Sequence, residues 1–152
     1  MEKKFKNQIL SVLSVVVVAV LGSVFVGLGM GWFNGLLKPD QWIPNFVIPI
    51  VWTLIYLIVS IYIAILSKSD RFDKNNIILF VVNGVLNVLW CLVFFTLHQT
   101  FLGLIVIVLN LVAGYVLYLR QDRKVVLARV LVIYPLWLSI ATLLNTAIWI
   151  LN

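Results

Sequence analysis

Five long apolar stretches account for most of this chain. They run from about residue 9 to 28, 46 to 66, 77 to 97, 101 to 119 and 125 to 151. Each is close to the ~20 residues that a helix needs to cross the ~30 Å hydrocarbon core of a bilayer. We therefore predict an all-α integral membrane protein, in which residues 1–152 form a single bundle of five transmembrane helices.

Basic residues are divided very unequally between the two ends of these stretches. Of the 11 Lys and Arg residues, only Lys38 lies at the end away from the N-terminus. The other ten are Lys3, Lys4, Lys6, Lys68, Arg71, Lys74, Arg120, Arg123, Lys124 and Arg129. Because cytoplasmic loops are enriched in Lys and Arg, we expect the N-terminus inside and the C-terminus outside. The formal charge of +6 is then expected to face anionic lipid rather than nucleic acid, with a plasma (inner) membrane as the default location.

One face of the third stretch carries amides and aromatic rings. Asn83, Asn87, Trp90 and Phe94 follow the helical spacing i, i+4, i+7 and i+11. Amides that faced lipid would lack hydrogen-bond partners, at a cost of several kcal/mol. This face is therefore expected to point into the bundle. Two interpretations remain open, because the amides could line a pocket or could only join neighbouring helices.

The segment between the first two stretches is rich in glycine, proline and aromatic residues. Gly29, Gly31 and Gly35 permit unusual backbone angles, whereas Pro39 and Pro44 restrict them. We expect residues 29–45 to form an irregular loop that contains Trp32 and Trp42. Such a loop is either an aromatic belt at the membrane surface or a cover over a cavity.

Aromatic residues on other stretches reach a similar depth in the membrane. Trp52 and Tyr56 lie one turn apart on the second stretch, and Trp137 and Ala141 lie one turn apart on the fifth. Pro135, within the fifth stretch, should free the carbonyl of Leu131 and bend the helix. We predict an aromatic-lined pocket for a flat, mostly apolar ligand. Its predicted binding residues are Trp32, Trp42, Trp52, Tyr56, Asn83, Asn87, Trp90, Phe94, Trp137 and Ala141.

The apolar stretches contain no conventional catalytic set. His98 falls at a short connection without an acid beside it, and Cys91 is the single cysteine. We therefore predict no metal site, no required cofactor and no acid–base or nucleophilic catalytic residue, with haem ligation by His98 as a minor alternative. The scarcity of ionisable groups at mid-membrane also argues against an ion-coupled transporter.

Four motifs follow one another along the chain. They are Trp32-Phe33-x-x-Leu36-x-Lys38-Pro39, Val51-Trp52-Thr53-x-x-Tyr56, Asn87-x-x-Trp90-Cys91-x-x-Phe94-Phe95 and Tyr134-x-x-Trp137-x-x-x-Ala141-x-x-x-Asn145. In this order they resemble motifs of the translocator protein / tryptophan-rich sensory protein family (TspO/MBR). The chain departs from the family pattern by one extra residue after Pro39, by Asn45 in place of a second proline, by Phe33 in place of Tyr and by Cys91 in place of Ser.

The resemblance implies a five-helix bundle, often a homodimer, that binds porphyrins, haem among them, or drug-like aromatic molecules. Sterol-like ligands bind some members of the family, and Val116-x-Tyr118-x-Arg120 resembles a sterol pattern. The leading interpretation is a receptor or sensor-like binder. One alternative is light-dependent oxidative breakdown of a bound protoporphyrin, using Trp52 and Trp137. The other is a scaffold that binds partner proteins and holds lipid in its pocket.

The predicted orientation can be tested with single cysteines. Asp40→Cys and Asp70→Cys, each in a Cys91→Ser background, should react with an impermeant thiol reagent from opposite sides of the membrane. In intact cells we expect labelling at position 40 only. Labelling at position 70 under the same conditions would contradict an N-terminus inside the cell.

Overall fold

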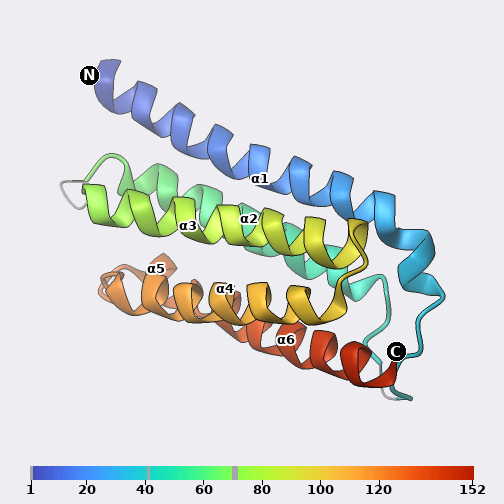
Figure 1. Cartoon of the computed structure of the whole chain (residues 1–152). Coiled ribbons are helices and arrows are strands. Elements are labelled where there is room, and N and C mark those ends of the chain that lie inside the picture. The colour runs from blue at the N-terminus through green and yellow to red at the C-terminus, as the bar shows by residue number, and fades with distance from the viewer. Residues whose placement is uncertain (1, 41, 70–71) are drawn as a thin grey trace.

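The computed structural model describes residues 2–40, 42–69 and 72–152. Its helices lie side by side in one bundle (Figure 1). In chain order they are α1 (Glu2–Asn34), α2 (Val47–Leu66), α3 (Lys74–Cys91), the π-helix η1 (Leu92–Thr96), α4 (Thr100–Arg120), α5 (Val126–Val130) and α6 (Ile133–Leu151). Within the described residues, five segments are long and apolar enough to span a membrane, namely Phe5–Asn34, Val47–Leu66, Lys74–Thr96, Thr100–Arg120 and Val126–Leu151. The predicted all-α, multi-pass fold is confirmed.

The helices contact one another in the order α1, α2, α6, α4, α3 around the bundle, and α3 returns to α1. The start of α1 and the α2–α3 and α4–α5 connections lie at one end (Figure 1). We call it the basic end, because Lys6, Lys68, Lys74 and Arg120 lie there. The described residues of the α1–α2 loop, 35–40 and 42–46, lie at the opposite end with Asn152, and we call this the loop end. Arg71, another of the basic residues used to predict the orientation, lies outside the described residues. Which end of the bundle faces the cytoplasm stays a prediction.

The first helix is longer than the sequence predicted. It continues to Asn34 instead of ending near residue 28, so Trp32 belongs to α1 and not to the loop. The sequence prediction was wrong here because Gly29 permits a close contact between helices and does not end the helix. A Cβ atom at this position would overlap the carbonyl group of Phe95 in η1. The glycine therefore allows two helix backbones to touch, and does not mark a loop.

A hydrogen bond fixes the same contact. The Thr96 hydroxyl donates to the Phe25 carbonyl oxygen of α1 over 2.9 Å. The acceptor lies one helical turn before Gly29. Together the glycine contact and this bond hold the loop-end half of α1 against η1.

Two predicted spans change geometry along their length. The third switches from α- to π-helix at Leu92, a distortion that often occurs near functional sites. The fifth divides into α5 and α6, because the chain turns just before Pro135. The Leu131 carbonyl, which the proline leaves free, accepts a hydrogen bond from the Tyr134 N–H at 3.1 Å. The predicted bend is therefore present, and its free carbonyl has a partner.

The main core lies between α3, η1, α4 and α6. Small residues of α4 let these helices approach closely, since a Cβ atom at Gly103 would lie 3.0 Å from Phe94 Cβ. A Cβ atom at Gly114 would lie 3.0 Å from Leu138 Cδ1. Both glycines are thus used for helix contacts within the chain.

The α1–η1 contact predicts opposite effects for two neighbouring glycines. Gly29→Ala should destabilise the protein by about 1–3 kcal/mol, the usual cost of overpacking, because the obstructing atoms belong to a backbone. Gly27→Ala is the matched control, since a Cβ atom there meets nothing within 4 Å. It should be neutral or stabilising by up to ~1 kcal/mol, because alanine favours the helix. Equal melting temperatures for the two variants in one detergent would disprove the contact.

Candidate functional site

An apolar cavity of about 830 Å³ lies between α1, α2 and η1. We call it the loop-end cavity. It is lined by three of the predicted binding residues, Trp52 and Tyr56 of α2 and Trp90 of α3. Its volume falls within the ~300–1,000 Å³ that is typical of small-molecule pockets. The cavity therefore has the size and the lining for a sizeable apolar ligand.

The aromatic rings of this wall form a connected series. Trp52 stacks on Tyr56 with ring centroids 5.7 Å apart, and its centroid lies 6.4 Å from that of Trp90. On its far side, Trp90 stacks on Phe94 at 5.7 Å and meets the edge of Phe95 at 5.6 Å. Trp90 thus joins the cavity wall to the buried core, and the core restricts its movement.

Hydrogen bonds fix the orientation of Trp90. Its indole Nε1 donates to Asn145 Oδ1 at 3.0 Å, and Asn145 Nδ2 donates to the Thr100 carbonyl oxygen at 2.9 Å. Asn145 is not among the binding residues that the sequence predicts. Its position four residues after Ala141 and eight after Trp137 places it on the same helical face, which was the available signal. Asn145 is a positioning residue that links α3, α4 and α6.

Three predicted residues lie in the core behind the cavity wall. Phe94, Trp137 and Ala141 are buried in the same cluster as Trp90, and none of them lines the loop-end cavity. The Trp137 indole nitrogen is buried without a hydrogen-bond partner. The structure therefore brings these side chains close to the cavity but separates them from it by other residues.

The two predicted covering residues lie over the loop end of the core. Trp32 stacks on His98 with centroids 4.4 Å apart and an interplanar angle of 13°. Its ring edge meets Phe94 at 5.6 Å. Trp42 lies 6.2 Å from Phe33. Neither tryptophan lines the loop-end cavity, so in this conformation they cover the core rather than the cavity itself.

The α1–α2 loop is anchored by a lysine. Lys38 Nζ donates to the carbonyl oxygens of Phe33 at 2.6 Å and Leu36 at 3.3 Å, and lies 4.6 Å from the centroid of the Phe33 ring. Desolvation lowers the pKa of Lys38. The carbonyl acceptors and the ring oppose this change, because they stabilise the ammonium form. Lys38 thus folds the start of the loop back onto the end of α1.

A second anchor for the loop comes from the last residue of the sequence, Asn152, which lies at the same end of the bundle. Asn152 Oδ1 accepts a hydrogen bond from the Leu37 N–H at 3.0 Å, and Asn152 Nδ2 donates to the Leu37 carbonyl oxygen at 3.1 Å. The same Nδ2 donates to the Ile148 carbonyl oxygen at 2.9 Å. One amide therefore ties the loop to α6, a role that the sequence did not predict.

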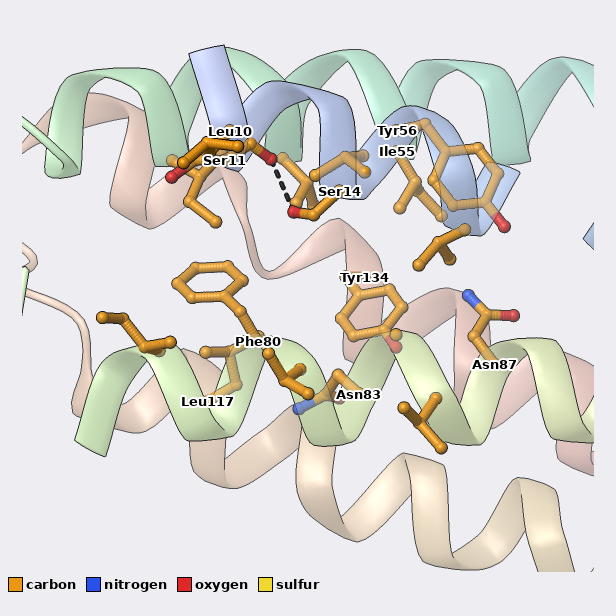
Figure 2. Close-up of a pocket in the computed structure, with 18 of the residues that line it drawn as sticks. Leu10, Ser11, Ser14, Ile55, Tyr56, Phe80, Asn83, Asn87, Leu117 and Tyr134 are labelled. Carbon is orange, nitrogen blue, oxygen red and sulfur yellow. Dashed lines mark hydrogen bonds between the residues drawn. The ribbon is translucent and has the colours of Figure 1, made fainter. Parts of the chain in front are cut away.

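A second cavity, of about 440 Å³, lies between α1, α2 and α3 nearer the basic end. We call it the basic-end cavity. Figure 2 shows Ser11 and Ser14 of α1 facing Phe80 of α3 across this space, and Asn87 further along α3, opposite Tyr56. The predicted binding residues Asn83 and Asn87 line it together with Tyr56, which borders both cavities. The predicted single set of residues is thus divided between two cavities, the core and the loop end.

Metal-binding chemistry is not visible in the described part of the chain. There, no three His, Cys, Asp or Glu residues lie close enough together to hold an ion. The cavities offer stacking surfaces and hydrogen-bonding groups instead, which suit the binding of an organic molecule.

Comparison with known proteins identifies relatives over nearly the whole chain. Residues 11–150 match the model of the TspO/MBR family. Protein CrtK of Rhodobacter capsulatus is 31% identical over 127 residues, which cover 80% of this chain and 78% of the relative. Tryptophan-rich protein TspO of Archaeoglobus fulgidus is 30% identical over 146 residues, which cover 93% of this chain and 94% of the relative. Tryptophan-rich protein TspO of Chlorobaculum tepidum is 30% identical over 142 residues, covering 89% of each chain.

The Asn152 anchor predicts a change in loop dynamics. Asn152→Ala removes both hydrogen bonds to Leu37, each of which contributes about 0.5–1.5 kcal/mol. Amide hydrogen exchange in residues 35–46 should therefore become faster, while α3 and α4 stay unchanged. Gln99→Ala is the matched control, because among the described residues this loop-end side-chain amide donates to the nearby Leu97 carbonyl oxygen, at 3.4 Å, and to no residue of the α1–α2 loop. Loop exchange that is equally fast in both variants would show that Asn152 does not hold the loop.

Proposed function

The chain belongs to the TspO/MBR family, and we propose that it is a receptor or sensor-like membrane protein that binds porphyrins or similar flat, apolar molecules. The loop-end cavity is the observation that supports this proposal most. It places Trp52, Tyr56 and Trp90 on one wall of a space of about 830 Å³. Aromatic wall residues bind flat π-systems by stacking, and each contact adds roughly 0.5–1.5 kcal/mol beyond the burial of apolar area.

An apolar ligand reaches this cavity from the lipid. Residues that line it, such as Val20 and Val24 of α1 and Leu57 of α2, also have exposed side chains. On a membrane-spanning surface such exposed apolar residues face acyl chains. The cavity is therefore open sideways between α1 and α2, so that a ligand dissolved in the bilayer enters without crossing water.

In the proposal, the predicted residues that line neither cavity support the aromatic wall from behind or cover the core beside it. Phe94, Trp137 and Ala141 form the packed layer behind Trp90. Trp32 and Trp42 cover the same core at the loop end, beside the cavity. No required cofactor or catalytic residue enters the proposal, and the bound porphyrin is a ligand.

The homodimer implied by the family also stays a proposal. Since Gly103 and Gly114 are occupied by contacts within the chain, a second copy would use a different face. A monomeric mass in several mild detergents and in nanodiscs would count against a dimer. Sterol-like ligands remain a further option for the same apolar surfaces.

The role of the cavity wall can be measured by titration with protoporphyrin in the dark. Trp52→Phe keeps an aromatic ring but reduces the stacking surface, so the Kd should rise about 2- to 12-fold, the equivalent of 0.5–1.5 kcal/mol. Trp149→Phe is the control, because Trp149 is exposed near the end of α6 and contacts Phe101 at 5.1 Å. Quenching of tryptophan fluorescence gives the affinities.

Three outcomes separate the candidate functions. If Trp52→Phe stays folded and binds as tightly as Trp149→Phe, the loop-end cavity is not the binding site. If the parent protein shows no saturable binding, the scaffold with a lipid-filled pocket becomes the better explanation. If bound pigment is lost under light in air but not in the dark or without oxygen, the oxidative alternative gains support, with Trp52 and Trp137 as the aromatic residues to replace.

A further inference from the structure

We infer that the basic-end cavity is a second ligand site, which takes a single-chain amphipathic molecule that carries a hydroxyl group. Its dimensions suit a chain better than a flat ring system. Along α1 it extends from Asn7 to Val18, and along α3 from Ile77 to Asn87. At 1.5 Å per helical residue both distances are roughly 15 Å, about half the ~30 Å hydrocarbon core. The cavity therefore spans the depth of one leaflet.

The lining of this cavity differs in kind from that of the loop-end cavity. It contains no tryptophan, and aliphatic residues such as Leu10, Ile55 and Ile63 make up half of it. Leu10, Val81 and Val85 are exposed as well as lining it, so the cavity opens towards lipid between α1 and α3. An acyl chain can enter through this opening and bury its methylene groups against the aliphatic wall.

A polar group at the inner limit of the cavity supplies the specificity. Asn87 is only 3% exposed, yet its Oδ1 has no hydrogen-bond partner. Figure 2 shows the Asn87 side chain directed from α3 towards the cavity, on the side where the Tyr56 hydroxyl lies. A buried carbonyl oxygen without a donor is unfavourable, so a ligand donor at this point is stabilised. A hydroxyl group suits the position because it can donate to Asn87 and accept from Tyr56.

Asn83 has a different role, although its Oδ1 also lacks a partner. Its Nδ2 donates to the Leu79 carbonyl oxygen at 2.8 Å and to the Ala113 carbonyl oxygen at 3.2 Å, which fixes the amide orientation. The oxygen then lies beside α4, 3.6 Å from where a Cβ atom at Gly114 would be. Asn83 therefore joins α3 to α4, and Asn87 is the residue that recognises the ligand.

The test uses a long-chain alcohol that carries a photoreactive diazirine in its chain, with the protein in nanodiscs. Mass spectrometry should find saturable labelling in residues 7–18 and 77–87, and the matched chain without a hydroxyl should label this region less. Asn87→Leu should weaken labelling by the alcohol about 2- to 12-fold, the effect of losing one hydrogen bond. It should not change labelling by the hydroxyl-free chain.

A second variant covers the case in which Asn87→Leu does not fold. Ser14→Phe adds a ring to the cavity from the lipid-exposed side of α1, and should abolish labelling while protoporphyrin binding is unchanged. Conversely, Trp52→Phe should leave alcohol labelling unchanged, so this site and the porphyrin site can fail independently. Equal labelling by the two chains, no saturable labelling in residues 7–18 and 77–87, or full labelling of Ser14→Phe would each overturn the inference.

Discussion

The close contact between the backbones of α1 and η1 is the constraint on which both cavities depend. Gly29 brings α1 against the Phe95 carbonyl group, and Thr96 adds a hydrogen bond to the Phe25 carbonyl oxygen. These contacts position the loop-end half of α1, which forms one side of the loop-end cavity. The other half of α1 lies nearer the basic end, and there the basic-end cavity lies between α1 and α3. A side chain at residue 29 would move α1, which forms one wall of both cavities.

Buried amides show how the same residue type serves different purposes in this bundle. Asn145 uses both ends of its amide, to orient Trp90 and to bind α4. Asn110 accepts a hydrogen bond from the Tyr134 hydroxyl at 3.1 Å. Asn87 keeps an unpartnered oxygen beside a cavity. The Nδ2 of Asn110 also lacks a partner, but Asn110 does not line either cavity. An unpartnered amide atom gains most from a ligand where it borders a cavity that a ligand can enter. The surroundings of each amide atom, and not residue identity, therefore distinguish structural from binding positions.

The sequence predicted the helices well because hydropathy and length alone define a membrane span. It also predicted the neighbouring aromatic wall of Trp52, Tyr56 and Trp90. It failed at Gly29, because a glycine that permits close packing looks the same as one that ends a helix. It could not divide the predicted residues between two cavities, since that division depends on how α1 packs against its neighbours. Nor could it rank Asn145 above Trp137, because both lie on the inward face of α6 and only their contacts separate them.

The central claim is that a flat, apolar ligand binds against the aromatic wall of the loop-end cavity. A crystal structure grown from a lipid phase with protoporphyrin tests it most directly. We expect density for the ring system between α1 and α2, in contact with Trp52 and Trp90, with the Trp90–Asn145 hydrogen bond kept. A porphyrin bound at another surface of the bundle, with only lipid in the loop-end cavity, would contradict it.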